Sequence, residues 1–343
     1  MADAAPPIFD TMLQVEEREA ADPAALAALL READTPFVVR GLVAEWPLVK
    51  AGLESARDAR AHLLGYARTL PFSVSLAPPD QGGRLFYGND MGMNFREGKG
   101  KLADIFAGFD KYEGEEDPPM AYLGSVDMRH YFDGLADANP SPVRDREPLE
   151  SIWIGTQTRI AAHNDFPDNL ACCAVGRRRF TVFPPDQFPN LYLGPLDNTP
   201  AGRAVSMVDF HAPDFGTHPR FAEALEKARF VELEPGDAIF IPSMWWHHVE
   251  GLAPFNVLVN YWWRETPRWL GQPQDALNHA ILAIRDLPED EKHVWRQLFD
   301  HYIFDNKADL TDHIPEGARG ILDPLTPEAA GRIRAFLLRN LNR

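Results

Sequence analysis

Between residues 120 and about 264 the chain alternates short apolar runs with Pro, Gly, Asn and Asp. Four such runs are Ile152-Trp153-Ile154, Phe180-Thr181-Val182-Phe183, Ala238-Ile239-Phe240-Ile241 and Val257-Leu258-Val259. Runs of this length with turn-forming residues between them are typical of many short strands. The pattern therefore predicts a β-sandwich or barrel rather than a parallel sheet built from βαβ units.

Before this region helical and strand patterns are mixed. Asp22-Pro23 precedes the alanine- and leucine-rich run 24–30, which predicts a capped helix with proline in its first turn. The run Pro36-Phe37-Val38-Val39 predicts a buried strand. The charged, proline-flanked loop at Glu115-Glu116-Asp117 marks the expected end of this N-terminal α/β extension, which we assign to residues 1–118.

After Pro267 the apolar residues recur at helical spacing. We therefore expect a helical region over 266–343, and a β core over 119–265. The simplest interpretation is that the apolar stripes pack on the β core, and a helical homodimer interface is the second. The first stripe consists of Leu277, Ala280, Ile281 and Ile284, and the second of Trp295, Leu298, Phe299 and Tyr302. The third lies in a helix that begins at Thr326-Pro327 and consists of Ala330, Ile333, Leu337 and Leu341.

Composition narrows the possible functions. Of the 343 residues 45% are hydrophobic, enough for a large core, and the formal net charge is −17. A surface this acidic repels phosphate backbones, so we expect no nucleic-acid binding, although a basic peptide would be attracted. No apolar stretch reaches the length of about 18 residues that a membrane span needs, and residues 1–7 lack the pattern of a signal peptide. The expected location is the cytoplasm.

Two adjacent cysteines, Cys172 and Cys173, complete the composition. Neighbouring cysteines rarely bridge each other without strain, and no further Cys or Cys/His cluster stands at zinc-site spacing. We expect both to be small core hydrophobes.

Two segments carry candidate metal ligands. In the first, His163 and Asp165 are two residues apart, and residues i and i+2 of a strand project from the same face. In the second, Pro235-Gly236-Asp237 forms a turn, an apolar strand follows, and His247 and His248 come after two tryptophans. Two histidines and one carboxylate on strands form the facial triad of non-haem iron(II) oxygenases, which leaves open positions on the metal. The spacing favours this class but does not choose between His247 and His248.

Further motifs give the chain a wider resemblance. They are Phe183-Pro184-Pro185-Asp186-Gln187-Phe188, Leu191-Tyr192, Pro195, Val208-Asp209-Phe210, Pro213-Asp214, Pro235-Gly236-Asp237, Ile241-Pro242 and Trp245-Trp246-His247-His248. In these motifs the chain resembles the cupin-like branch of the JmjC hydroxylases, and within it the asparaginyl hydroxylase that inhibits hypoxia-inducible factor. The resemblance is strong over 120–262 and weaker at Leu85-Phe86-Tyr87 and Met93-Asn94-Phe95. It implies a double-stranded β-helix, or jelly-roll, as the core.

The resemblance also implies roles for individual residues. His163 and Asp165 match the first two iron ligands of the family, and His247, rather than His248, matches the third. The positions that line the 2-oxoglutarate pocket are matched by Tyr122, Asn169, Asn260 and Trp262. The asparagines would lie near the metal-chelating end, and the Tyr122 hydroxyl would point to the distal carboxylate.

The chain departs from the family pattern at three places. Arg178 stands where a lysine commonly pairs with the distal carboxylate of 2-oxoglutarate, and an arginine can bind a carboxylate with two hydrogen bonds. Strand alternation turns it away from Arg177 and Arg179, so we expect Arg178 to face the pocket. Ile160 replaces a threonine that also holds the cosubstrate. Ala204-Val205-Ser206-Met207 replaces the polar side chains that hold the target asparagine, so asparaginyl hydroxylation does not follow.

These features predict an iron(II)- and 2-oxoglutarate-dependent oxygenase that hydroxylates a protein or peptide side chain or a small molecule, with decarboxylation of 2-oxoglutarate to succinate. One alternative is a non-catalytic cupin-type binding or regulatory module, against which the complete triad and its cationic neighbour argue. The other is a metal dioxygenase or isomerase that does not use 2-oxoglutarate. If Arg178 points into the pocket, the 2-oxoglutarate-dependent oxygenase is favoured over a dioxygenase or isomerase that does not use 2-oxoglutarate.

Overall fold

The computed structural model describes residues 8, 12–112, 114–115, 117–307 and 309–341. Residues 1–7, in which we expected no signal peptide, and Glu116 of the expected boundary loop lie outside the described residues. The chain divides into two compact units, Met1–Trp263 and Arg264–Arg343. Every helix that the structure describes is too short or too polar to cross a membrane.

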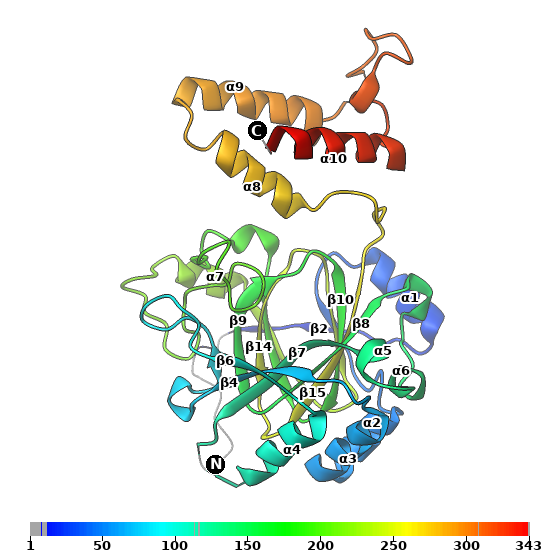
Figure 1. The fold of residues 1–343 in the computed structure, drawn as a ribbon, viewed down its shortest axis with the longest axis vertical. Helices are drawn as coiled ribbons and strands as arrows, with labels where there is room; N and C mark the ends of the chain where they lie inside the picture. Colours follow the sequence, from blue (N-terminus) through cyan, green and yellow to red (C-terminus); the bar gives the residue numbers. More distant parts are fainter. Residues whose placement is uncertain (1–7, 9–11, 113, 116, 308, 342–343) are drawn as a thin grey trace. The chain divides into compact units, whose positions relative to one another are not determined.

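The first unit is built on two β-sheets (Figure 1). The six-stranded sheet has the order β1-β12-β11-β14-β9-β5, and the nine-stranded sheet the order β2-β3-β13-β10-β15-β8-β7-β4-β6. The strands are β1 (Leu13–Gln14), β2 (Glu16–Glu17), β3 (Phe37–Val39), β4 (Phe72–Ala77), β5 (Arg84–Leu85), β6 (Arg96–Gly100), β7 (Met120–Asp127), β8 (Leu149–Gly155), β9 (Thr158–Asn164), β10 (Asp168–Val175), β11 (Arg178–Phe183), β12 (Arg229–Leu233), β13 (Ala238–Ile241), β14 (Trp246–Gly251) and β15 (Asn256–Trp263). This architecture confirms the mainly β jelly-roll expected from the pattern of short apolar runs.

A core between the two sheets is formed by the inward-facing residues of each strand. Phe180 and Val182 of β11 meet Ile239 and Ile241 of β13 in one buried cluster, with Leu258 of β15 beside them. These residues are two positions apart in each strand, because successive side chains of a strand point to opposite faces of the sheet. The two sheets are thereby held face to face around the space that contains the candidate site.

Helices cover the other face of the nine-stranded sheet (Figure 1). They are α1 (Pro23–Glu32), α2 (Pro47–Glu54), α3 (Ala56–Tyr66), α4 (Leu102–Lys111), α5 (Met128–Tyr131) and α6 (Leu135–Ala138), while α7 (Phe221–Lys227) packs against residues of the six-stranded sheet. The expected first helix is confirmed, since Asp22 caps α1 by accepting the N–H of Ala25 at 2.8 Å. Leu26 and Leu30 of this helix pack in the same cluster as Phe37 of β3.

The first 118 residues contribute strands to both sheets. β3, the buried strand expected at Pro36-Phe37-Val38-Val39, pairs with β13, and β4 pairs with β7. β5 pairs with β9 of the six-stranded sheet. This segment therefore supplies part of the wall around the space between the sheets.

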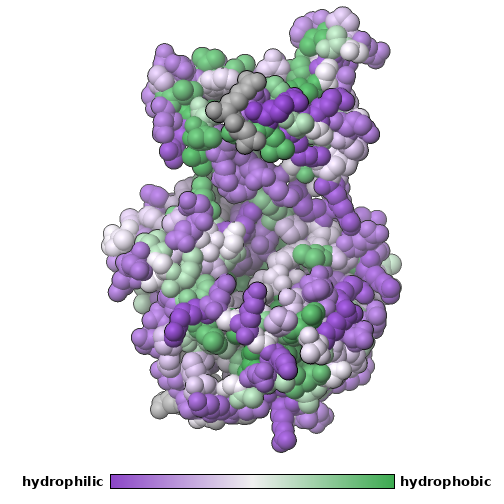
Figure 2. Space-filling model, viewed as in Figure 1, coloured by the Kyte–Doolittle hydropathy of each residue, from purple (hydrophilic) through white to green (hydrophobic). Residues whose placement is uncertain are grey.

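The second unit is helical, as the pattern after Pro267 predicts. Its helices are α8 (Pro273–Ala283), α9 (Glu289–Phe299) and α10 (Pro327–Leu341). Thr326 caps α10 by accepting the N–H of Ala329. Many apolar side chains of these helices are exposed in the single chain, among them Leu298 and Phe336, and hydrophobic side chains are visible on the surface of this unit in Figure 2.

Candidate metal centre

Two antiparallel strands, β9 and β14, bring the three candidate ligands together. His163 lies directly opposite His247 in the register, and Asp165 follows one residue beyond the end of β9. One ligand atom from each of these residues lies within 4.8 Å of the others. His248 points to the opposite side of β14, where its ring packs on Phe210 with 4.5 Å between centroids. The structure thus groups His247, and not His248, with the other two ligands.

A β-bulge in β9 adjusts this register. Ala161 and Ala162 together lie opposite His248, so β9 carries one extra residue between Ile160 and His163. Residues three apart in a regular strand face opposite sides, but here Ile160 and His163 both line the same pocket. The carbonyl of Ala162 accepts a hydrogen bond from the backbone N–H of Ser206 at 2.8 Å instead of from β14.

Backbone carbonyls orient both imidazole rings. Nδ1 of His163 lies 2.9 Å from the carbonyl oxygen of Ala161, and Nδ1 of His247 lies 3.1 Å from that of Trp245. A carbonyl can only accept, so each Nδ1 carries the proton and each Nε2 keeps its lone pair free. A hydrogen bond from Nδ1 to a carbonyl fixes the ring and prepares the histidine to bind a metal through Nε2.

The protonation states suit a cation. Burial, reinforced by the adjacent ring of His247, lowers the pKa of His163 to about 4. Burial alone would raise the pKa of Asp165, but the adjacent ring of His247, with His163 and Arg203 nearby, lowers it to about 2. At neutral pH His163 is therefore neutral and Asp165 is ionised, as metal ligands must be.

The three residues lie in the wall of a pocket of about 330 Å³ between the sheets. Arg178 lies in the same wall and is only 1% exposed, yet its Nε and Nη2 have no hydrogen-bond partner among the described residues. Burial lowers the pKa of Arg178, and the nearby Tyr122 partly offsets this effect. Burial also raises the pKa of Tyr122 to about 12, so its hydroxyl stays protonated and can donate. The inner part of the pocket therefore presents donors and a positive charge without a matching anion.

The other predicted cosubstrate residues line this pocket as well. Nδ2 of Asn260 lies 3.4 Å from Oδ1 of Asn169, and these residues belong to the neighbouring strands β15 and β10. Trp262 follows two residues after Asn260 on the same face, and its Nε1 has no hydrogen-bond partner among the residues the structure describes. All eight predicted site residues therefore border one pocket.

The structure adds residues that the sequence did not single out. Nε1 of Trp153 donates to Oδ1 of Asn260 at 2.7 Å, which fixes the orientation of that amide. Arg203 lies over the ring of Phe166 at 3.6 Å and donates from Nε to the carbonyl of Asn164. Trp153 stands in a predicted strand, but neither alternation nor a motif marked it. Arg203 lies in an irregular loop, where no periodicity indicates a direction.

Comparison with known proteins agrees with this geometry. The chain belongs to the cupin-like domain family, whose profile matches residues 23–268. It is 29% identical over 150 residues to HSPB1-associated protein 1 of Rattus norvegicus (42% of this chain, 30% of the relative) and 32% identical over 123 residues to lysine-specific demethylase JMJ31 of Arabidopsis thaliana (35% and 22%). It is 31% identical over 147 residues to tRNA wybutosine-synthesizing protein 5 of Gallus gallus (38% and 43%). The resemblance to cupin-like JmjC proteins is thereby confirmed, and the chain spans less than half the length of each of these relatives.

Proposed function

We propose that this protein is an iron(II)- and 2-oxoglutarate-dependent oxygenase that hydroxylates a side chain of a protein or peptide, or a small molecule. The observation that carries the proposal is the buried guanidinium of Arg178, which faces the same pocket as the triad and has two nitrogens, Nε and Nη2, without hydrogen-bond partners among the described residues. A buried cation left unpaired is costly, so it indicates an anionic ligand that completes the site.

The residues present fit iron(II). Two imidazoles with free Nε2 atoms and one ionised carboxylate form the ligand set of non-haem iron oxygenases. His163, Asp165 and His247 would hold the metal from one side. When bound, iron(II) and 2-oxoglutarate would allow O₂ to act as the oxidant, with one oxygen atom entering succinate as the cosubstrate loses CO₂ and the other entering the hydroxylated C–H bond of the substrate.

The residues also fit 2-oxoglutarate as cosubstrate. Arg178 and the Tyr122 hydroxyl can donate to its distal carboxylate, while Asn169 and Asn260 lie on strands that border the same pocket. This arrangement favours 2-oxoglutarate over a dioxygenase that needs no cosubstrate, because such an enzyme has no use for a buried arginine. The site's own share in catalysis is to position the reactants and exclude water.

The remaining wall of the pocket faces the substrate. It combines apolar Phe95, Ala201 and Val205 with the hydroxyls of Ser73, Ser75 and Ser125 and the carboxylate of Glu97. Ser206, the polar residue of the Ala204-Val205-Ser206-Met207 segment, is buried and donates instead to the carbonyl of Leu191 at 2.6 Å. This segment therefore offers no free side-chain group to hold a primary amide, which supports a substrate other than asparagine.

Succinate formation tests the proposal. Anaerobically purified protein is given iron(II), ascorbate and 2-oxoglutarate, and then air, and succinate is quantified by mass spectrometry. We expect slow turnover even without the prime substrate, and its loss in His247→Ala and Arg178→Gln. Arg177→Gln, one residue away but on the opposite face, is the matched control and should retain the activity.

Calorimetry provides the second arm. We expect 2-oxoglutarate to bind the manganese-loaded protein, with its affinity lowered at least ten-fold in Arg178→Gln and unchanged in Arg177→Gln. If the wild-type protein neither produces succinate nor binds 2-oxoglutarate, the oxygenase assignment is wrong and a non-catalytic cupin-type binding module takes its place.

A further inference from the structure

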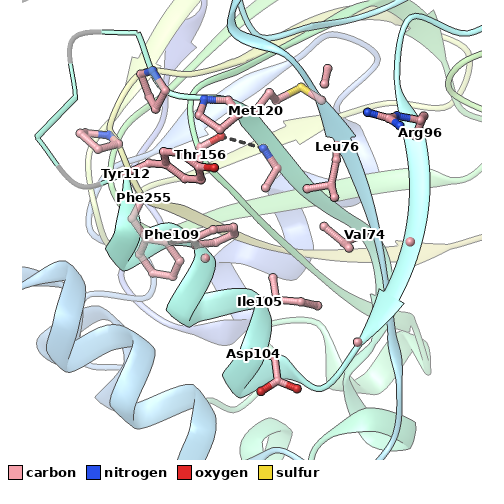
Figure 3. Close-up of a pocket in the computed structure, with 18 of the residues that line it drawn as sticks. Val74, Leu76, Arg96, Asp104, Ile105, Phe109, Tyr112, Met120, Thr156 and Phe255 are labelled. Atoms are coloured by element: carbon pink, nitrogen blue, oxygen red, sulfur yellow. Dashed lines mark hydrogen bonds between the residues drawn. The ribbon is translucent and has the colours of Figure 1, made fainter.

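A second cavity lies on the other face of strand β4 (Figure 3). Leu76 lines this cavity and Ser73 and Ser75 line the metal pocket, because successive residues of a strand point to opposite faces, while Val74 borders both spaces. Its volume is about 560 Å³, within the range of roughly 300–1,000 Å³ typical of small-molecule sites. The cavity is therefore a separate space that the oxygenase chemistry does not use.

Two apolar walls face each other across this cavity. Figure 3 shows Phe109, Tyr112 and Phe255 on one side and Val74 and Leu76 on the other. Phe109 and Phe255 pack with 6.0 Å between ring centroids, so the aromatic wall is fixed. Leu76 is 47% exposed although it stands in the interior of a strand. Such an exposed leucine within a hollow gains by contact with an apolar ligand.

Glycines keep the floor of the cavity open. β6 is an edge strand of five residues, and its Gly98 and Gly100 both line the cavity, in register with Val74 and Phe72 of β4. A Cβ added to Gly98 would have its nearest neighbour at 3.8 Å, so the space there is not taken by other side chains. Glycine weakens a strand and often marks a place where another molecule approaches the backbone closely.

The charges around the cavity are mainly positive. Among the residues that the structure describes, Arg60, Arg96 and Lys99 line it with a single carboxylate, Asp104, in a chain whose formal net charge is −17. Arg60 is paired with Asp110 at 2.7 Å, but Arg96 forms no ion pair with any carboxylate of the described residues. Asp104 lies at the other end of the cavity from Arg96 (Figure 3). An anionic group is therefore favoured at the Arg96 end.

We propose that this cavity is a second ligand site, for a small apolar molecule that carries one anionic group. The apolar part lies between β4 and the wall of Phe109, Tyr112 and Phe255, and the acid lies at Arg96. The proposal is independent of the oxygenase function, because it requires neither iron nor 2-oxoglutarate.

Calorimetry of the full chain without iron or 2-oxoglutarate tests this site with two probes, decanoate and decan-1-ol. We expect decanoate to bind several-fold more tightly than decan-1-ol, which has the same chain length without the charge. Gly98→Leu fills the cavity and should weaken both probes at least ten-fold. Arg96→Gln should lower the affinity for decanoate to that for decan-1-ol.

Matched controls lie on neighbouring elements outside the cavity. Gly65→Leu in α3, where an added Cβ meets no atom within 4 Å, and Arg68→Gln should leave both affinities unchanged. Leu76→Asp replaces an exposed residue and serves if Gly98→Leu fails to fold; it should weaken decanoate strongly. Absence of decanoate binding, or binding that survives both Gly98→Leu and Leu76→Asp, would overturn the site. Equal affinity for the two probes would contradict its preference for an anion.

Discussion

Arg178 and Arg179 are neighbours in the chain, but they meet opposite surroundings. Arg179 is paired with Glu232 at 2.7 Å and with the buried Glu250 at 3.3 Å, on the outer face of the six-stranded sheet. Arg178 lies on the inner face, where two of its N–H groups have no partner among the described residues. Because a buried charge needs a partner, Arg179 is a structural residue, and we propose that Arg178 binds the anionic ligand of the pocket.

The two arginines should therefore respond oppositely to the same substitution. We expect Arg178→Met to raise the free energy of unfolding of the ligand-free protein by about 1–3 kcal/mol, because it removes unsatisfied buried donors, and to abolish 2-oxoglutarate binding. Arg179→Met should lower that free energy by about 1–3 kcal/mol, since it removes the ion pairs with Glu232 and the buried Glu250 and leaves Glu250 with only His211 and His248 beside it. Urea denaturation measures both. Destabilisation by Arg178→Met would show that Arg178 is a structural residue.

Two buried histidines make the metal-free protein sensitive to acid. Burial lowers the pKa values of His163 and His248 to about 4, whereas a histidine in the unfolded chain titrates near 6.5. As the pH falls below 6.5 the unfolded chain takes up protons first, so stability is lost between pH 6.5 and 4. From pH 7 to pH 5 we expect a loss of about 2 kcal/mol per histidine.

Urea denaturation at pH 7, 6 and 5 checks this expectation. His248→Leu removes one of these groups and leaves the metal ligands in place, so the loss of stability from pH 7 to pH 5 should be smaller by about 2 kcal/mol. An unchanged slope in this variant would mean that His248 is already protonated in the folded protein or is accessible to water.

At the scale of elements, β10 is the central strand on which the site depends. It pairs with β13 on one side and β15 on the other, and it carries Asn169 toward the pocket. Cys172 and Cys173 follow in the same strand and are fully buried, as expected for core residues. One side chain faces the cluster under the helices and the other the core between the sheets.

Both thiols should be unreactive in the native protein. Burial raises the pKa of Cys173 to about 12 and that of Cys172 well above its usual range, and the thiol form is a poor nucleophile. With Ellman's reagent at pH 8 we expect no labelling of the native chain and two thiols labelled in urea. Prompt labelling of the native protein would show that β10 opens locally.

At the scale of the whole molecule, the C-terminal unit leaves apolar side chains uncovered. Trp295, Leu298 and Tyr302, the stripe expected on the second C-terminal helix, are 44%, 37% and 46% exposed in the single chain. A contiguous apolar surface of this kind is typical of protein interfaces. We propose that it forms a homodimer interface, in which two copies of this unit cover each other.

Sedimentation velocity tests the dimer. We expect the wild-type chain to sediment as a dimer and Leu298→Glu as a monomer, because a charge cannot be buried without a partner. Leu53→Glu, which changes a 65% exposed leucine of α2, is the matched control and should remain dimeric. A monomeric wild-type protein would contradict the interface.

The sequence by itself determined the classes of element and the chemistry of the site. Short apolar runs bounded by turn residues predicted strands β8, β11, β13 and β15, and capping chemistry predicted α1 and α10, because these signals depend on neighbours in the chain. Alternation also turned Arg178 to one face and its neighbours to the other. The residue types of His163, Asp165 and His247 limited which metal ions the site can bind, since two imidazoles and a carboxylate suit few ions.

Tertiary structure alone decided which faces meet. The bulge at Ala161-Ala162 places Ile160 and His163 on the same face of β9. The pairing of β9 with β14 places His247, and not His248, beside His163. Trp153 reaches the pocket through packing between segments far apart in the sequence, and so do Ser73 and Glu97 from the first 118 residues. Contacts of the same kind place Arg203 on Phe166 and Asn164 next to the site. Register and sheet packing arise from contacts between distant residues, and no local pattern records them.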